Sequence, residues 1–268
     1  MLSEHNKKLF FMVFLTKICY KTENILKGKN MKIRNNADIS GRFMKQIVLA
    51  VSFICVISFS AGADTISTDK SGFAEISSVI DDAAFDIRYY SANNFTGNKI
   101  NGYKAPRAYL TKEALSALAK AAEDLRNQGY RLLIWDSYRP QKAVDNFVKW
   151  INDANDQGDK SFYPTLEKSN LLVGNYIAEK SGHTRGSTVD LTIIKKDGGF
   201  VDMGGTFDLF SEISHPDYAD ITDEQKHNRQ ILHDAMTKAG FVGIDSEWWH
   251  FTLENEPYKD TYFNFDVE

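Results

Sequence analysis

The chain has 268 residues, with 32 Lys and Arg against 36 Asp and Glu, and its formal net charge is -4 at pH 7. Residues 1–63 hold 10 basic and 3 acidic residues, so the rest of the chain carries 22 basic and 33 acidic residues. A body this acidic argues against nucleic acid as a partner and against a role at a membrane surface.

Residues 44–63 have the pattern of a secretory signal peptide. A short basic start is followed by an apolar run over residues 47–59 and then by Ala61-Gly62-Ala63, where small residues fit a cleavage site. The run has 13 residues, fewer than the roughly 20 that a helix needs to span a bilayer. We therefore expect cleavage after Ala63, no stable membrane anchor afterwards, and a periplasmic or secreted product.

This pattern divides the chain into three parts. Residues 1–43 are interpreted as an upstream extension from a mis-assigned start, residues 44–63 as the signal peptide, and residues 64–268 as the functional domain. Both cysteines, Cys19 and Cys55, precede the expected cleavage. The mature chain therefore has no disulfide, no thiolate nucleophile and no cysteine metal ligand.

Residue periodicity and turn residues predict the elements in the first half of the mature chain. In chain order these are an exposed lead-in over 64–80, a strand over 84–90, a loop over 93–109, a helix over 113–127, a buried strand over 130–135, and a helix from Pro140 to about Asn152. Thr111 suits the N-cap of the first helix, and Gly129 suits the position after its end. Arg139 lies where the buried strand ends, a common place for functional side chains, although an arginine there can also serve only a surface salt bridge.

The same signals predict the second half. In chain order the elements are a polar loop over 153–163, a short strand or irregular segment over 171–179, a half-buried strand over 189–193, a turn over 195–198, a glycine-rich loop over 202–208, a helix over 222–239, a strand over 249–253, and an aromatic tail over 258–265 that packs down. Alternation in the strand over 189–193 directs Asp190 and Thr192 toward a cleft. Helices and strands mix without strict alternation and no internal repeat is visible, so the predicted fold class is α+β in a single domain.

Two distant segments hold residues that suit a metal site. His183 and Asp190 are seven residues apart, and in a straight strand they would face opposite ways. Gly186 lies between them and tolerates the positive φ of a sharp bend. Glu247 and His250 are three residues apart, a spacing that a helical turn places on one side.

Two histidines, an aspartate and a spare glutamate are the minimum for a catalytic zinc site, which needs three ligands, an open position for water, and a base. The residues alone leave this open, because no strong motif such as HExxH is present and two unrelated core or surface histidines would give the same pattern. A triad of Ser181, His183 and Asp190 lacks the G-x-S-x-G elbow. Nothing in the sequence selects a glycosidase pair of carboxylates.

Several motifs together resemble one family. They are Asn94-Phe95-Thr96-Gly97, Trp135-Asp136-Ser137-Tyr138-Arg139-Pro140, Ser181-x-His183-x-x-Gly186-x-x-x-Asp190, Glu247-Trp248-Trp249-His250 and Glu256-Pro257-Tyr258. In this order they resemble the VanX-type D-alanyl-D-alanine dipeptidases, which are zinc peptidases of bacterial cell-wall metabolism. The resemblance covers roughly residues 75–268. It implies a central antiparallel sheet flanked by helices, with the zinc site in a cleft, as in hedgehog-like and DD-peptidase-like domains.

The resemblance also implies roles for single residues. His183, Asp190 and His250 would bind one Zn2+ per chain, and Glu247 would be the general base that activates the zinc-bound water. Arg139 would stabilise the oxyanion of the tetrahedral intermediate, because it is a fixed charge aimed where negative charge develops.

Two further positions match the substrate pocket of this family. They are Ser181 and Asp208, and the Asp208 carboxylate would suit the ammonium group of the dipeptide. The sequence departs from the family at Gly182, where VanX-type enzymes have a second serine. A glycine there is expected to loosen the pocket wall and makes the role of Ser181 less secure.

The reaction that the resemblance implies is hydrolysis of D-Ala-D-Ala to two D-alanine molecules. An exported enzyme cannot reach the cytoplasmic pool of this dipeptide, so salvage during cell-wall turnover is expected instead. Two alternatives stay open: a D,D- or L,D-carboxypeptidase that acts on peptidoglycan stem peptides, and a non-catalytic cell-wall binding module, which would lack a ligand or the base. No oligomeric state is predicted.

Overall fold

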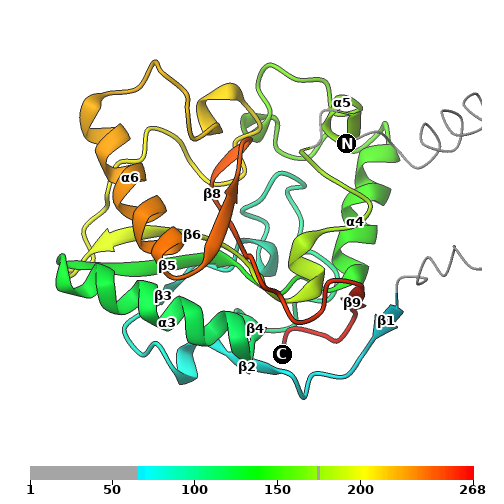
Figure 1. The fold of residues 1–268 in the computed structure, drawn as a ribbon. Coiled ribbons are helices and arrows are strands. Elements are labelled where there is room, and N and C mark those ends of the chain that lie inside the picture. Colours follow the sequence, from blue (N-terminus) through cyan, green and yellow to red (C-terminus); the bar gives the residue numbers. More distant parts are fainter. Residues whose placement is uncertain (1–64, 174–175) are drawn as a thin grey trace, which may run out of the picture. The chain divides into compact units, whose positions relative to one another are not determined.

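A computed structural model describes residues 65–173 and 176–268 (Figure 1). The predicted upstream extension and signal peptide, residues 1–63, lie outside the described residues. Among the residues that are described, no helix is both long enough and apolar enough to cross a membrane.

A five-stranded sheet lies at the centre of this part of the chain. In spatial order its strands are β3 (Ala84–Phe85), β5 (Tyr130–Asp136), β6 (Thr188–Lys195), β8 (Glu247–Leu253) and β7 (Phe241–Ile244). Neighbouring strands are antiparallel, except for the short edge pair of β3 and β5, which is parallel. The predicted α+β class and the antiparallel central sheet are confirmed.

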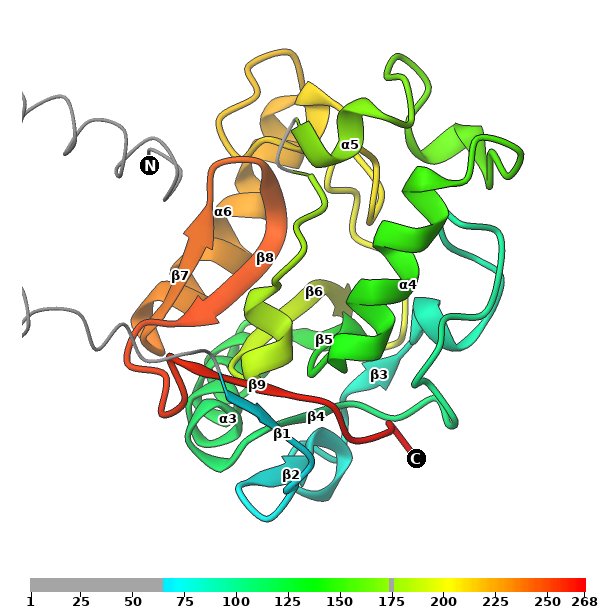
Figure 2. The ribbon, with the colours of Figure 1, turned by 90° about the vertical axis from the view of Figure 1, so that its right-hand side faces the viewer.

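The helices lie on both sides of this sheet. They are α3 (Lys112–Asn127), α4 (Gln141–Asn152), α5 (Asn170–Val173) and α6 (Asp223–Lys238). Figures 1 and 2 show α6 on one side of β8 and α4 on the other. The predicted start signals operate as expected: the Thr111 hydroxyl accepts a hydrogen bond from the Ala114 amide at 3.3 Å, and Thr222 and Gln225 form a capping box at the start of α6.

Two small sheets involve segments that the sequence analysis interpreted as lead-in and loop. β1 (Thr65–Ser67) pairs in parallel with β9 (Thr261–Phe263), and β2 (Phe73–Glu75) pairs antiparallel with β4 (Tyr109–Thr111). The predicted strand over 84–90 is shorter than expected, because β3 ends at Phe85 and a 3-10 turn follows over Arg88–Tyr90. Strands of two or three residues are too short to show alternation, and their pairing depends on partners distant in the sequence.

Two other expectations need correction. The segment over 171–179 begins within the helix α5, and only its described remainder, 176–179, is irregular. Thr192 is as buried as Asp190, each being 2% exposed, but only Asp190 lines the cavity described below. β6 pairs with a strand on each edge and is buried along nearly its whole length. In such a central strand, alternating apolar and polar residues do not distinguish a solvent-exposed face from a buried one.

The aromatic tail packs down, as predicted. The rings of Phe263 and Phe265 meet Phe73 edge-on at 4.8 and 4.9 Å between centroids, and Phe265 stacks on Tyr138 at 4.0 Å. The Tyr138 hydroxyl donates a hydrogen bond to the Phe265 carbonyl at 2.9 Å. These ring contacts fasten the C-terminal segment to β2 and to the loop that follows β5.

Candidate metal centre and substrate pocket

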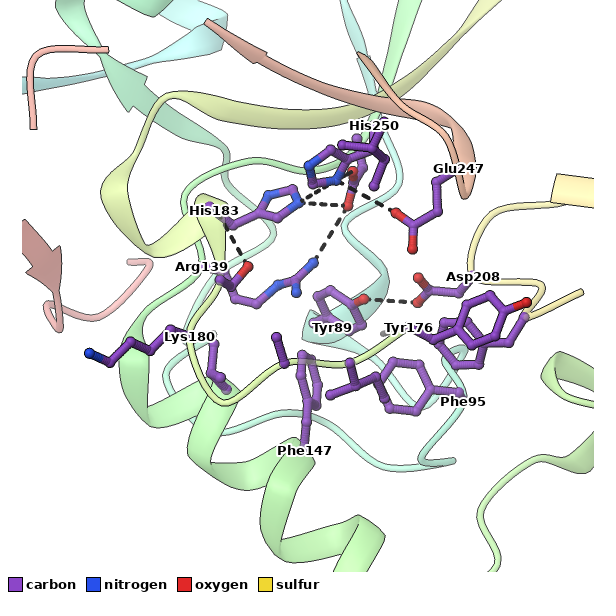
Figure 3. Close-up of a pocket in the computed structure, with 18 residues that line it drawn as sticks. Tyr89, Phe95, Arg139, Phe147, Tyr176, Lys180, His183, Asp208, Glu247 and His250 are labelled. Carbon is purple, nitrogen blue, oxygen red and sulfur yellow. Dashed lines mark hydrogen bonds and ion pairs between the residues drawn. The ribbon is translucent and has the colours of Figure 1, made fainter. Parts of the chain in front are cut away.

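Three potential metal ligands come together at one end of the sheet (Figure 3). The Nε2 atom of His183 lies 3.1 Å from Oδ2 of Asp190, and the Nδ1 atom of His250 lies 3.0 Å from Oδ1 of the same carboxylate. The two imidazole nitrogens are 3.3 Å apart. The three groups offer ligand atoms that all lie within 4.8 Å of one another, which is close enough to share one ion.

A tight turn brings His183 to Asp190. Residues Gly182–Arg185 form a 3-10 turn that ends at Gly186, whose φ of 80° lies in the left-handed region. β6 starts two residues later, so the bend lies where the sequence analysis expected it. A side chain at Gly186 would be strained by this φ, which explains the glycine.

Strand pairing brings His250 to the same place. Asp190 on β6 is directly opposite His250 on β8, and on its other edge it pairs with Asp136 of β5. Residues directly opposite each other on antiparallel strands have their side chains about 5 Å apart. The register of β6 against β8 therefore places His250 beside Asp190.

Glu247 reaches the site in a way that the sequence analysis did not expect. Glu247 and His250 lie in strand β8, not in a helical turn. The pairing of β7 with β8 is irregular, since Gly243 pairs with Phe251 but the next residue, Ile244, pairs with Glu247. This irregularity changes the direction of the side chains and leaves a Glu247 oxygen 3.6 Å from Nδ1 of His250.

The donor set fits a divalent metal. The Nδ1 of His183 donates to the Ser137 carbonyl at 2.7 Å, so its Nε2 keeps a lone pair directed at Asp190. The Oδ1 atom of Asp190 is buried and makes no well-directed hydrogen bond, although Nδ1 of His250 lies 3.0 Å away, and a cation bound between the two atoms would satisfy both. Burial lowers the pKa of His183 and favours the neutral imidazole. Although burial opposes its charge, the two histidines hold the pKa of Asp190 below its usual range.

Arg139 points into the same pocket and is not a surface residue. Its side chain is 13% exposed, its Nε donates to Asp136 at 2.8 Å, and its Nη2 lies 3.5 Å from Asp190. The guanidinium sits 5.0 Å from the ring centroid of Tyr89 and 5.3 Å from that of Phe147. The alternative of a surface salt bridge is therefore excluded, and Arg139 is held by charge and by cation–π contacts.

Two buried tyrosines support these charges, and the sequence analysis assigned neither. The Tyr103 hydroxyl donates to Asp136 at 2.6 Å, and the Tyr89 hydroxyl donates to Asp208 at 2.9 Å. Asp136 could have been found from the sequence, because it belongs to the motif around Arg139 and lies at the end of a predicted buried strand. The tyrosines had no such signal, because they approach from distant loops.

Asp208 lies opposite the metal ligands and has an unusual backbone. Its φ is 60°, in the left-handed region that aspartate tolerates better than most residues. Burial, together with the negative charges of Asp190 and Glu247, raises the pKa of Asp208 well above its usual value. A buried carboxyl group in this state would regain its charge when a cation arrives.

Ser181 caps the turn that carries His183. Its hydroxyl accepts a hydrogen bond from the His183 amide at 3.3 Å, and the residue lines the pocket. The neighbouring Gly182 is closely packed, because a Cβ there would lie 2.9 Å from the Thr188 hydroxyl. The effect of Gly182 on the looseness of the pocket wall stays a prediction.

The three potential metal ligands, together with Glu247, Arg139 and Asp208, line one small cavity of about 170 Å3 between α4 and the sheet. Aromatic and aliphatic side chains, including Phe95, Phe147 and Phe210, form its wall. Burial raises the pKa of Glu247 to about 7, which suits a group that must accept and return a proton near neutral pH. A small molecule with a cationic end and a bond to be polarised would match the arrangement (Figure 3).

Known proteins resemble this chain over the same region. A family model described as D-ala-D-ala dipeptidase, Peptidase_M15, matches residues 69–268. A D-alanyl-D-alanine dipeptidase of Streptomyces coelicolor is 40% identical over 197 residues, which is 73% of this chain and 98% of that protein. Another, of Enterococcus faecalis, is 40% identical over 200 residues, 74% of this chain and 99% of that protein. A crystal structure of the vancomycin resistance D,D-pentapeptidase VanY with Zn(II) has a TM-score of 0.34 and 12% identity, covering 57% of this chain and 77% of that one.

Proposed function

Because the chain belongs to the D-ala-D-ala dipeptidase family, Peptidase_M15, we propose that it hydrolyses D-Ala-D-Ala to two molecules of D-alanine with one Zn2+ as cofactor. The two dipeptidases described above, from Streptomyces coelicolor and Enterococcus faecalis, match the chain along nearly their whole length. The observation that carries the proposal is the convergence of two imidazoles and a carboxylate beside a spare glutamate in one small cavity.

His183, Asp190 and His250 would hold the zinc ion. When bound, zinc is a Lewis acid that polarises a carbonyl group and lowers the pKa of a water molecule. The neutral state of His183, set by its burial and by its hydrogen bond to the Ser137 carbonyl, prepares it for this role.

Glu247 would move the proton. Its carboxylate lies beside His250 and lines the cavity, so it can take a proton from the attacking water and return it to the amine of the departing D-alanine. Both transfers require a pKa between those of the donor and the acceptor, and burial moves the pKa of Glu247 toward neutrality.

Arg139 would face the oxygen of the scissile carbonyl as negative charge develops on it. An arginine keeps its charge at any working pH. Its ion pair with Asp136 and its contacts with two aromatic rings fix the guanidinium before substrate arrives, so little reorganisation is needed.

Asp208 would bind the free ammonium of the dipeptide. This assignment favours a dipeptidase over a carboxypeptidase, because a longer stem peptide has an amide in place of the ammonium and would leave a buried carboxyl group without a cation. Ser181 would line the same pocket while holding the amide of His183.

The test compares free D-Ala-D-Ala with N-acetyl-D-Ala-D-Ala and measures D-alanine release by the zinc-loaded protein. We expect turnover of the free dipeptide and at least about a hundredfold lower kcat/KM for the acetylated form, since one buried charge pair is worth about 3 kcal/mol or more. Equal rates on both substrates would favour the carboxypeptidase, and no release from either would contradict the proposal.

We also propose that the enzyme acts outside the cytoplasm, on D-Ala-D-Ala released during cell-wall turnover. The support is the sequence pattern of residues 44–63, with its basic start, apolar run and small residues before Asp64. A reporter fused behind residues 44–63 should be exported. A reporter that stays in the cytoplasm would contradict the location and leave the chemistry unaffected.

A further inference from the structure

The motif Glu256-Pro257-Tyr258 takes no part in the function proposed above. Glu256 follows the end of β8, the strand that carries His250. Its carboxylate accepts two hydrogen bonds from Arg185, one from Nε and one from Nη2, each 2.8 Å long. Arg185 is the last residue of the turn that carries His183.

We propose that Arg185 and Glu256 are a positioning pair, which holds the turn of His183 against the segment after β8 so that the three metal ligands are assembled before the metal binds. The inference rests on the proposed zinc site and adds two residues to it. Neither residue lines the cavity, so both act through His183 and not on the substrate.

Within the turn itself, the backbone hydrogen bonds to other segments come from the side of β4 and β5, and the first backbone bond to β8 is made just after the turn, where the Ser187 carbonyl accepts from the Leu253 amide at 2.9 Å. The His183 carbonyl accepts from the Arg139 amide at 3.3 Å, and the Gly186 carbonyl accepts from the Thr111 amide at 2.7 Å. Both donors lie near β4 and the end of β5. The Arg185 side chain adds a tie from the turn itself to Glu256, in the segment that continues from the other histidine ligand, and so helps to fix the separation of His183 and His250.

The pair is built to fix an orientation. Its side chains are only 20% and 10% exposed, unlike ordinary surface pairs that contribute little. Two parallel hydrogen bonds between a planar guanidinium and a carboxylate restrict rotation as well as distance. The ring of Tyr262 on β9 lies 6.0 Å from the guanidinium, and Figure 2 shows β9 passing beside the turn.

Assembly before binding affects metal affinity. If the turn spent part of its time elsewhere, the apparent dissociation constant would rise in proportion to the lost fraction of assembled sites. Once zinc is saturating, the metal itself would hold the turn, so a broken pair would cost affinity more than turnover. A purely structural ion pair would lower stability without changing zinc affinity in the folded protein.

The experiment uses the full chain and two variants, Glu256→Gln and Arg185→Lys. The matched control is Asp82→Asn, which breaks the similar two-point pair of Arg126 and Asp82, with bonds of 2.9 and 2.7 Å, outside the pocket. Zinc dissociation constants are measured by competition with a chromophoric chelator, at a temperature where circular dichroism shows each protein folded. Values of kcat and KM are measured at saturating zinc.

We expect a zinc dissociation constant about tenfold higher for Glu256→Gln and Arg185→Lys, with kcat at saturating zinc within about twofold of the original. Asp82→Asn should bind zinc as the unchanged protein does. Unchanged affinity in both site variants overturns the positioning role and leaves the proposed function standing. If the unchanged protein itself binds no zinc, the proposed function fails first. Should Glu256→Gln not fold, Arg185→Lys, which keeps the positive charge, decides the question.

Discussion

At the scale of single residues, Glu247 offers the sharpest separation of chemistry from binding. Its carboxylate is beside the metal ligands but is not one of the three that converge. We expect Glu247→Gln to keep one zinc ion per chain and to lose about 10²–10⁴-fold in kcat, the usual contribution of a general base. Metal analysis and D-alanine release measure the two effects. Glu254→Gln, an exposed change on the same segment, is the control; full turnover by zinc-loaded Glu247→Gln would exclude the assigned role.

Gly182 carries a second prediction at this scale. A Cβ there would lie 2.9 Å from the Thr188 hydroxyl, which is itself 2.9 Å from the Thr252 hydroxyl, so it has little freedom to move. Gly182→Ala should therefore destabilise the protein by about 1–3 kcal/mol, as overpacking does. Adding Thr188→Ala removes the obstacle, and the double variant should lose less than the sum of the single changes. Additive losses in denaturant unfolding would show that the contact is not the cause.

The role of a single residue could be predicted where the residue stands in a sequence motif, and not where it depends on a partner distant in the sequence. His183, Asp190, Glu247 and His250 each stand in a motif, and the motifs in order suggested their roles, although spacing alone left unrelated histidines possible. Tyr103 and Tyr89 could not be predicted. Their partners, Asp136 and Asp208, are 33 and 119 residues away in sequence, so only the folded chain shows the contacts.

At the scale of elements, the turn at Gly186 depends on strand β2. Gly186 has a φ of 80°, and a Cβ there would lie 2.1 Å from the Phe73 ring. Gly129 also has a positive φ, 91°, but no atom lies within 4 Å of its would-be Cβ. Gly129→Ala should therefore cost only the backbone strain, about 1–2 kcal/mol.

Gly186→Ala should cost the same strain plus the overlap with Phe73, about 1–3 kcal/mol more. It should also weaken zinc binding, because the displaced turn carries His183. Equilibrium unfolding and zinc titration of the two variants side by side test this. Equal losses of stability, with unchanged zinc affinity in both, would show that the ring contact does not hold the turn.

Elements with their own start and stop signals could be predicted, and those defined by distant partners could not. The helices α3 and α6 begin at the predicted caps because their hydroxyl-to-amide bonds are local. The irregular pairing of β7 with β8 was missed, and the spacing of Glu247 and His250 was ascribed to a helical turn. Two residues three apart can also face the same side in a strand whose register shifts. The sequence pattern alone does not distinguish such a strand from a helical turn.

At the scale of the whole molecule, zinc binding and folding should be linked. The three ligands come from two segments far apart in the chain, and the unfolded chain does not hold them together. Zinc at a hundred times its dissociation constant should therefore stabilise the fold by about 2.7 kcal/mol. A chelator should lower the melting temperature and added zinc should restore it. The shift should vanish in His250→Ala and persist in His233→Ala, which changes an exposed histidine; a shift that survives His250→Ala would indicate zinc bound elsewhere.

The α+β class of the molecule followed from the mixture of helical and strand patterns, but the order of the strands did not. β6 lies between β5 and β8, and this arrangement places Asp190 between Asp136 and His250. No local signal specifies which strands become neighbours, because pairing is chosen by the packing of the complete core. The motifs therefore predicted which residues form the site, but the register of the assembled sheet brings those residues together.

The position of the metal decides whether these residues form the proposed site, and anomalous diffraction at the zinc edge from crystals of the zinc-loaded protein locates it. We predict one strong peak per chain, within bonding distance of Nε2 of His183, the Asp190 carboxylate and Nδ1 of His250. A peak at another place, or no peak in a protein that nevertheless releases D-alanine, would contradict the account.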